Sequence, residues 1–200
     1  MTIQQTQQTP TEDMAFMGRL RGYLEKSRVA CELHIQACEK NGKVDALALA
    51  VYPQLQAIED DIEERIRVIT RQNLVWERWG RRVKGCGPML LGAIMCRADI
   101  HRLNTVSSMW AHFGFAPGQK RVAGEKLDFD LTGKTWCWRQ GAQFLRYDCK
   151  FREVYDDRKA YETTTWERQG GTIVPGAKGK TLKATERAAG HIHARALRYM

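Results

Sequence analysis

The feature that most constrains the fold is a pair of long segments in which apolar residues recur every three or four positions. The first covers residues 12–41 and the second covers residues 44–82, with Asn41-Gly42 at the junction. This spacing places apolar side chains on one face of an α-helix, and asparagine followed by glycine favours a helix stop. We therefore expect two long amphipathic helices that pack as an antiparallel, coiled-coil-like hairpin. Pro53 interrupts the second segment, and we expect a break or kink there.

The composition is that of a globular chain that can bury one sizeable core. Of the 200 residues, 43% are hydrophobic and 28% are charged. No apolar run approaches the ~18 residues of a membrane span, and the polar N-terminus does not match a signal peptide. We expect a cytoplasmic protein with reduced cysteines, and residues 1–11, rich in Gln and Thr, are predicted to form a disordered tail.

The net charge of +9 is unevenly distributed along the chain. Residues 1–80 carry 10 Lys/Arg and 12 Asp/Glu, whereas residues 81–200 carry 22 Lys/Arg and 11 Asp/Glu. Such an excess of cations predicts a polyanionic partner. Nucleic acid is favoured over an acidic membrane because no amphipathic lipid-facing helix accompanies the charge. The alternative is a basic surface that only keeps the protein soluble.

Residues 83–94 have the pattern of a helix-hairpin-helix motif: an apolar residue, then Gly-x-Gly, then a helix with apolar spacing. Gly85 and Gly87 allow a tight turn in which backbone N–H groups at a helix N-terminus donate to a phosphate oxygen without reading a base. Pro88 suits the first helical turn, and Lys84 adds positive charge. The alternative is a turn between helices that serves packing alone.

Further elements follow along the chain. Thr105 or Asn104 is a suitable N-cap for a short helix that Gly114 would end. Alternation of apolar and acidic residues over 127–131 predicts a short extended segment. Residues 136–155 are predicted to form one helix in which aromatic and cationic residues interleave. For Phe144, Tyr147, Phe151 and Tyr155, core packing is favoured over contact with bases.

The order of these segments resembles the C-terminal domain of the insertion-sequence 110 family of transposases. The resemblance rests on a long charged helix, the Gly-x-Gly-Pro turn at 85–88, Asp-Ile-x-Arg at 99–102, Phe-Gly-Phe-Ala-Pro at 113–117 and a basic glycine-containing loop. It covers residues 54–161, about half of the chain. The resemblance implies an all-α DNA-binding domain.

Two departures from the family limit what the resemblance implies. Members of the family carry an N-terminal RuvC-like domain with four acidic metal ligands, and this chain has no βαβ pattern to hold one. The family also places a serine nucleophile before a glycine of the basic loop. Here Ala123 precedes Gly124, and no serine follows Ser108. We therefore expect DNA binding without catalysis, metal or cofactor.

The fold class that we predict is all-α, with a helical hairpin at 12–82, a helix-hairpin-helix-bearing basic domain at 83–168, and a basic loop and C-terminal helix at 169–200. The expected partners are DNA, with structured RNA as an alternative, and a second copy bound through the hairpin. The residues expected to contact nucleic acid are Lys84, Gly85, Gly87, Lys120, Arg121, Gly124, Lys126, Lys134, Arg139 and Arg146.

Alternatives to this interpretation belong to other functional classes. One is an active transposase or recombinase subunit that works with a separate RuvC-like partner or a guide RNA. Another is a helical scaffold whose charge is incidental. The spacing of Cys31, His34 and Cys38 places three potential zinc ligands on one helical face, but a partly buried helix seam explains it better.

Overall fold

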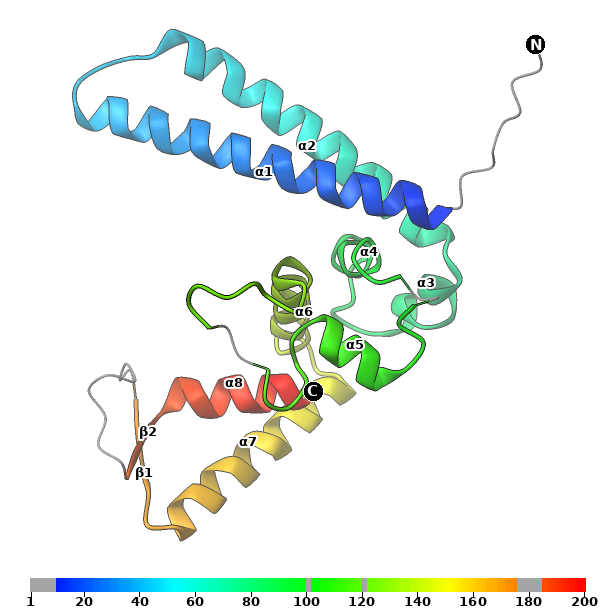
Figure 1. Ribbon diagram of the computed structural model, residues 1–200, viewed down its shortest axis with the longest axis vertical. Coiled ribbons are helices and arrows are strands. Elements are labelled where there is room, and N and C mark those ends of the chain that lie inside the picture. The colour runs from blue at the N-terminus through cyan, green and yellow to red at the C-terminus, as the bar shows by residue number, and fades with distance from the viewer. Residues whose placement is uncertain (1–9, 100–101, 120–121, 176–184) are drawn as a thin grey trace. The chain divides into compact units, whose positions relative to one another are not determined.

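The computed structural model describes residues 10–99, 102–119, 122–175 and 185–200 (Figure 1). Most of these residues are helical, and they include one short two-stranded sheet, so the protein is mostly α-helical, as predicted. The chain divides into two compact units. Unit 1 consists of residues 1–80 and 87–109, and unit 2 consists of residues 81–86 and 110–200.

Unit 1 contains α1 (Pro10–Lys40), α2 (Ala46–Gln72), α3 (Leu74–Arg78) and α4 (Pro88–Met95). The predicted stop after the first helix is confirmed. Gly42 has φ 65°, its N–H donates to the Glu39 carbonyl at 3.0 Å, and the Lys43 N–H donates to the Cys38 carbonyl at 2.9 Å. These two bonds satisfy carbonyls that the end of α1 leaves without helical partners. Asp45 then caps α2 by accepting from the Ala48 N–H.

The second helix differs from the prediction at two places. It continues through Pro53, so the expected break at that residue is wrong. It also ends at Gln72, where Asn73 takes an extended conformation and caps α3 by accepting from the Val75 N–H. A 3₁₀ turn, η1 (Gly80–Arg82), follows α3. Contacts with α1 stabilise α2 on both sides of Pro53, whereas the polar side chain of Asn73 competes with the helix for backbone N–H groups.

The core of unit 1 is built from α1, α2 and α4, and α1 and α2 lie side by side (Figure 1). At Gly92 the backbone of α4 approaches α2 so closely that an added Cβ would lie 2.3 Å from Thr70 Oγ1. The buried core residues are Met14, Ile62, Ile66 and Cys96, with Met17, Leu20, Leu24, Ile69, Met89 and Met95 packed around them.

A short helix, α5 (Val106–His112), crosses from the residues of unit 1 to those of unit 2. Its predicted cap and stop are confirmed. The Thr105 hydroxyl accepts from the Ser108 N–H at 3.1 Å, and Gly114 has φ 67° after the helix ends.

Unit 2 contains α6 (Leu131–Phe144), α7 (Lys150–Arg168) and α8 (Ala189–Tyr199). Its sheet joins β1 (Thr172–Val174) to β2 (Glu186–Ala188) in parallel, an element that the sequence pattern did not indicate. The core residues Tyr155, Ala196 and Leu197 pack α8 against α7.

Two predicted segments of unit 2 are wrong. The single helix over 136–155 is two helices, with α6 ending at Phe144 and α7 beginning at Lys150. The segment 127–131 forms no strand, and Leu131 starts α6 because the Asp130 carboxylate accepts from the N–H groups of Thr132 and Gly133.

The aromatic residues that were predicted to be core follow the prediction in part. Phe144 and Tyr155 are buried, and Phe144 stacks on Phe151 with 4.5 Å between ring centroids. Tyr147, however, has 47% of its surface exposed.

The two units do not follow the predicted domain boundaries. Residues 87–109 group with the long helices of unit 1, and α8 packs on α7 rather than forming a separate tail. Pro10 and Thr11 belong to α1, and residues 1–9 of the predicted tail lie outside the described residues. All six cysteines are free thiols. Over the described ranges, no helix is both long and apolar enough to cross a bilayer.

Candidate nucleic-acid interface

The positive charge of the chain resides in unit 2. Unit 2 carries 20 Lys/Arg and 10 Asp/Glu, whereas unit 1 carries 12 Lys/Arg and 13 Asp/Glu. In unit 1, five of the six arginines of α1 and α2 pair with carboxylates of the same two helices; these arginines are Arg21, Arg28, Arg65, Arg67 and Arg71. The net excess of positive charge therefore lies in unit 2, although single exposed cations also occur in unit 1.

The Gly-x-Gly segment is explained in part by packing. Gly85 has φ 84°, and an added Cβ would lie 2.9 Å from Tyr147 Cδ2. Its carbonyl accepts from Gln140 Nε2 at 2.9 Å, which ties the turn to α6. Both the conformation and the space at this position require glycine, whether or not a phosphate binds. Lys84, next to it, is exposed and has no partner among the described residues.

Gly87 is placed differently from Gly85. It is the N-cap of α4, with φ −91°, and an added Cβ would meet nothing within 4 Å. Gly87 belongs to unit 1, whereas Lys84 and Gly85 belong to unit 2. Neither strain nor crowding therefore requires glycine at position 87.

The basic loop of the sequence is described only in part. Lys120 and Arg121 lie outside the described residues. Gly124 has φ 85° in an exposed turn that the Glu125 N–H closes by donating to the Val122 carbonyl at 3.3 Å. Lys126, just beyond, is exposed and has no partner in the described parts of the chain.

Lys134 lies on α6 with its ammonium directed into unit 2. Nζ donates to the Gly114 carbonyl at 2.6 Å and lies 4.6 Å from the centroid of the Phe129 ring. Burial, and to a lesser extent the charge of Arg198, lower the pKa of Lys134. This ammonium already has a hydrogen-bond acceptor and an aromatic ring as neighbours, so it is less available to a phosphate than the exposed side chains of Lys84, Lys126 and Arg146.

The two other predicted arginines, Arg139 and Arg146, are on or just beyond α6. Arg139 is exposed, with its guanidinium 4.6 Å from the centroid of the Trp136 ring. Arg146 follows the end of α6, is exposed, and has no partner among the residues described. Stacking on the indole helps to hold the guanidinium of Arg139.

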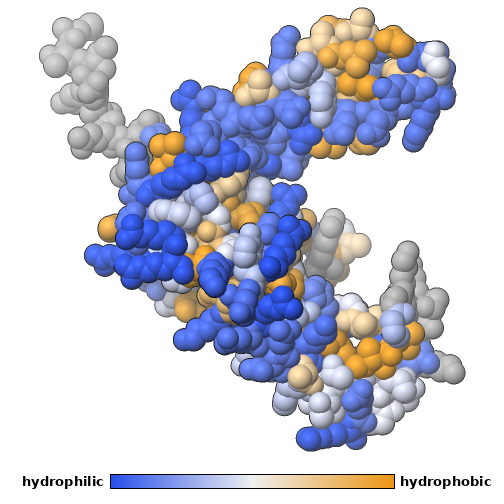
Figure 2. Space-filling model, turned by 180° about the vertical axis from the view of Figure 1, so that it is seen from behind, coloured by the Kyte–Doolittle hydropathy of each residue, from blue (hydrophilic) through white to orange (hydrophobic). Residues whose placement is uncertain are grey.

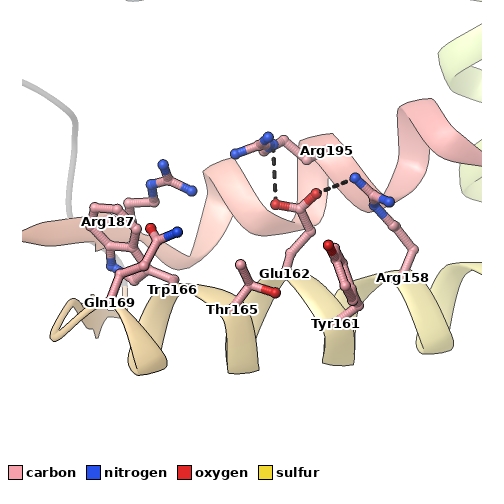
Figure 3. Close-up of a pocket in the computed structure, with 8 residues that line it drawn as sticks. All are labelled: Arg158, Tyr161, Glu162, Thr165, Trp166, Gln169, Arg187 and Arg195. Carbon is pink, nitrogen blue, oxygen red and sulfur yellow. Dashed lines mark hydrogen bonds and ion pairs between the residues drawn. The ribbon is translucent and has the colours of Figure 1, made fainter.

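Sequence reasoning missed a second group of cations, on α7, β2 and α8 (Figure 3). The carboxylate of Glu162 is buried, with 5% of the residue exposed. It accepts from Arg158 Nη2 at 2.6 Å on one oxygen and pairs with Arg195 Nε at 3.2 Å on the other. The i, i+4 spacing of Arg158 and Glu162 is visible in the sequence, but Arg195 is 33 positions beyond Glu162.

A third arginine lies beside this group. The guanidinium carbon of Arg187, on β2, is 3.8 Å from the centroid of the Trp166 ring on α7. The Trp166 indole N–H donates to the Thr172 carbonyl at 3.1 Å, which fixes the ring. Figure 3 shows Arg187 and Arg195 on the α8 side of the group and Arg158 on α7. No spacing rule in the sequence would have predicted that Arg187 lies over Trp166 or that Arg195 pairs with Glu162.

Two of the three possible zinc ligands of α1 have partners outside the set, and the Sγ of Cys38 lies 3.6 Å from His34 Nε2. The Cys31 thiol lies 3.4 Å from the Ala48 carbonyl, and His34 Nε2 is 3.0 Å from Asp45 Oδ2. Within the described ranges, no group of three or more His, Cys, Asp or Glu side chains is arranged to hold a metal ion.

In comparisons with known proteins, no protein-family model, curated protein or solved structure matches the chain.

Proposed function

We propose that unit 2 binds nucleic acid, with DNA as the expected form, through contacts to the phosphate backbone that tolerate any sequence. One observation carries the proposal. Unit 2 carries 20 Lys/Arg against 10 Asp/Glu, and its exposed cations Lys84, Lys126 and Arg146 have no carboxylate partner among the described residues, whereas five of the six arginines of α1 and α2 are paired. Cations that are not neutralised within the protein can replace the counterions of a phosphate backbone.

The resemblance to the insertion-sequence 110 transposases supports DNA as the partner and the turn at residues 83–86, in unit 2, as a contact. It does not support strand exchange by this chain. Ala123 stands where the family places its serine, and a methyl group cannot attack phosphorus. The proposed activity is therefore binding, and an active subunit would need its nucleophile from elsewhere.

A salt titration of binding tests the proposal. Fluorescence anisotropy should be measured on duplex, branched and single-stranded DNA and on structured RNA, at several salt concentrations. For duplex DNA, log K should fall linearly with log salt, because each neutralised phosphate releases about 0.9 counterion. The double variant Lys84→Gln/Lys126→Gln should flatten the slope by about two.

The matched control removes two cations from unit 1. Lys26 and Lys43 are exposed and have no partner in the described parts of the chain, so Lys26→Gln/Lys43→Gln changes net charge by the same amount. The control should leave the slope unchanged. Equal flattening by both double variants would show that net charge, rather than a surface of unit 2, governs binding.

Self-association is a second candidate function, and it rests on a different observation. Apolar side chains gather where α1 turns into α2 (Figure 2). Leu33, Val44 and Leu47 have 59%, 80% and 74% of their surface exposed. Sedimentation of the full chain at micromolar concentration should reveal a dimer that Leu33→Gln/Leu47→Gln dissociates, and a monomeric parent protein would contradict it.

A further inference from the structure

A pocket of about 240 Å³ in unit 2 is lined by side chains of α7, β2 and α8 (Figure 3). Three of its lining residues are arginines, Arg158, Arg187 and Arg195, and one is an acid, Glu162. The remaining lining residues are Tyr161, Thr165, Trp166 and Gln169. The pocket therefore has a surplus of two positive charges, bounded by polar and aromatic groups.

The arginines of the pocket are held in place, but not all of their N–H donors are engaged. A guanidinium has five N–H donors. Arg158 Nη2 donates to one oxygen of the buried Glu162, and Arg195 Nε forms an ion pair with the other. Arg158 also lies over the Tyr161 and Tyr199 rings, at 5.0 and 4.5 Å from the centroids. The carboxylate and the rings fix the guanidinium planes and leave further donors for a ligand.

Arg187 is held by a ring alone. It lies over Trp166 and has no carboxylate partner among the described residues. The backbone of Gly171 is also close to the indole, since an added Cβ there would lie 2.3 Å from the ring. The ring is thus occupied by Arg187 and by Gly171, which favours an anion held by the guanidinium over a nucleobase stacked on the indole.

We propose that this pocket binds a phosphate monoester at the end of a nucleic-acid strand, an inference that rests on the proposed function of unit 2. Three guanidiniums offer paired N–H groups that match the oxygens of a phosphate. A terminal phosphate carries nearly two negative charges, which balances the surplus of the pocket. A phosphodiester within a strand carries one negative charge and has chain on both sides. A pocket of about 240 Å³ with three arginines therefore suits a terminal phosphate better than a phosphodiester within a strand.

The test compares strands that differ only at their ends. Single-stranded and duplex oligonucleotides with a 5′-phosphate, a 3′-phosphate or hydroxyl ends are titrated by anisotropy with the full chain. We expect one phosphorylated end to bind about tenfold more tightly than the hydroxyl end, on the scale of charge-assisted hydrogen bonds. Inorganic phosphate should compete with that gain. Equal affinity of all three ends overturns the inference.

Substitutions of the pocket arginines test whether the gain in affinity from a phosphorylated end comes from the pocket. Arg187→Gln and Arg195→Gln should abolish the preference for a phosphorylated end. Arg187→Lys retains the charge and the contact with Trp166 but loses the planar fork, so it should lose most of the preference while remaining folded. The matched control, Arg168→Gln, removes an exposed cation of α7 that does not line the pocket and should retain the preference. A preference that survives both Arg187 variants overturns the assignment.

A covalently closed DNA circle separates this inference from the proposed function. It has no strand ends, so its binding depends on the backbone contacts of unit 2 alone. Binding of the circle without any gain from phosphorylated ends overturns the pocket and leaves the proposed function standing. Failure of the circle and of every oligonucleotide to bind overturns both.

Discussion

Each unit of the protein contains a buried glutamate that two arginines share. In unit 1, Glu59 is 5% exposed, with Arg21 Nη2 at 3.1 Å and Arg28 Nε at 2.7 Å. In unit 2, Glu162 is 5% exposed, with Arg158 Nη2 at 2.6 Å and Arg195 Nε at 3.2 Å. The local arrangement is the same, but its surroundings differ.

The difference lies in the charges around each pair of arginines. In unit 1, Arg21 also contacts Glu25 and Glu63, and Arg28 also contacts Glu32, so carboxylates outnumber arginines. The hydrogen bond to Glu59 raises the pKa of Arg28 above its usual value. The side chain of Arg21 is 10% exposed, whereas that of Arg195 is 49% exposed.

In unit 2, three arginines (Arg158, Arg187 and Arg195) lie beside a single carboxylate, that of Glu162. In the unit 1 network, which we call closed, every arginine is paired with more than one carboxylate, and the pairs hold α1 and α2 together. The unit 2 network retains donors toward a pocket. We infer that a buried arginine–glutamate pair is structural where carboxylates are in excess and the arginines are buried. It can bind an anionic ligand where arginines are in excess and are exposed to solvent.

The largest effect that tests this comparison is the loss of the unit 1 carboxylate. Glu59→Gln should lower the free energy of unfolding by about 3 kcal/mol, because it removes one partner of a desolvated ion pair. Urea unfolding followed by circular dichroism measures it. A loss below about 1 kcal/mol would mean that Glu25, Glu32 and Glu63 compensate fully.

Loss of the unit 2 carboxylate should cost less. Glu162→Gln should lower the free energy of unfolding by about 1–2 kcal/mol, less than an ion pair buried on both sides, because its arginines are partly exposed and can turn to water. The same urea titration gives the order of the two variants. The reverse order would refute the distinction between a closed and an open network.

Lys134 tests whether the lack of a partner within the protein, rather than membership of unit 2, makes a cation available to DNA. Its ammonium is bonded to the Gly114 carbonyl, so Lys134→Met should lower the free energy of unfolding by about 1 kcal/mol. The salt slope of DNA binding should not change, in contrast to Lys84→Gln/Lys126→Gln. A flatter slope for Lys134→Met would place Lys134 on the binding surface.

The effect that is smallest at neutral pH concerns two buried thiols, one in each unit. Burial raises the pKa of Cys96, in unit 1, and of Cys86, in unit 2, from 9.0 to about 11. The folded state thus holds these protons more tightly than the unfolded state does. Their contribution to stability is complete below pH 9 and is lost as the pH rises through 11.

Alkylation read by mass spectrometry measures this at each thiol. At pH 9 both thiols should react far more slowly in the folded chain than in urea. Glu59→Gln should speed the labelling of Cys96 and leave Cys86 protected, and Glu162→Gln should do the opposite. Equal labelling of both thiols in both variants would mean that the units unfold together.

The sequence by itself determined the features that depend on neighbours within a few residues. Apolar spacing gave the mostly helical fold, Asn41-Gly42 gave the end of α1, and Thr105 and Gly114 gave the bounds of α5. Counting charges located the basic part of the chain. Caps, turns and helical periodicity are local interactions, so a sequence displays them directly.

Tertiary structure decided everything that depends on which surfaces meet. Contacts with α1 keep α2 helical through Pro53, and Gly114 together with Phe129 draws the ammonium of Lys134 inward. Packing of α8 on α7 brings Arg195 to Glu162 across 33 positions of sequence. The charge of a side chain can be read from its letter. Whether that charge is neutralised depends on long-range packing, because an ion pair forms only where the fold brings its two members within a few ångströms of each other.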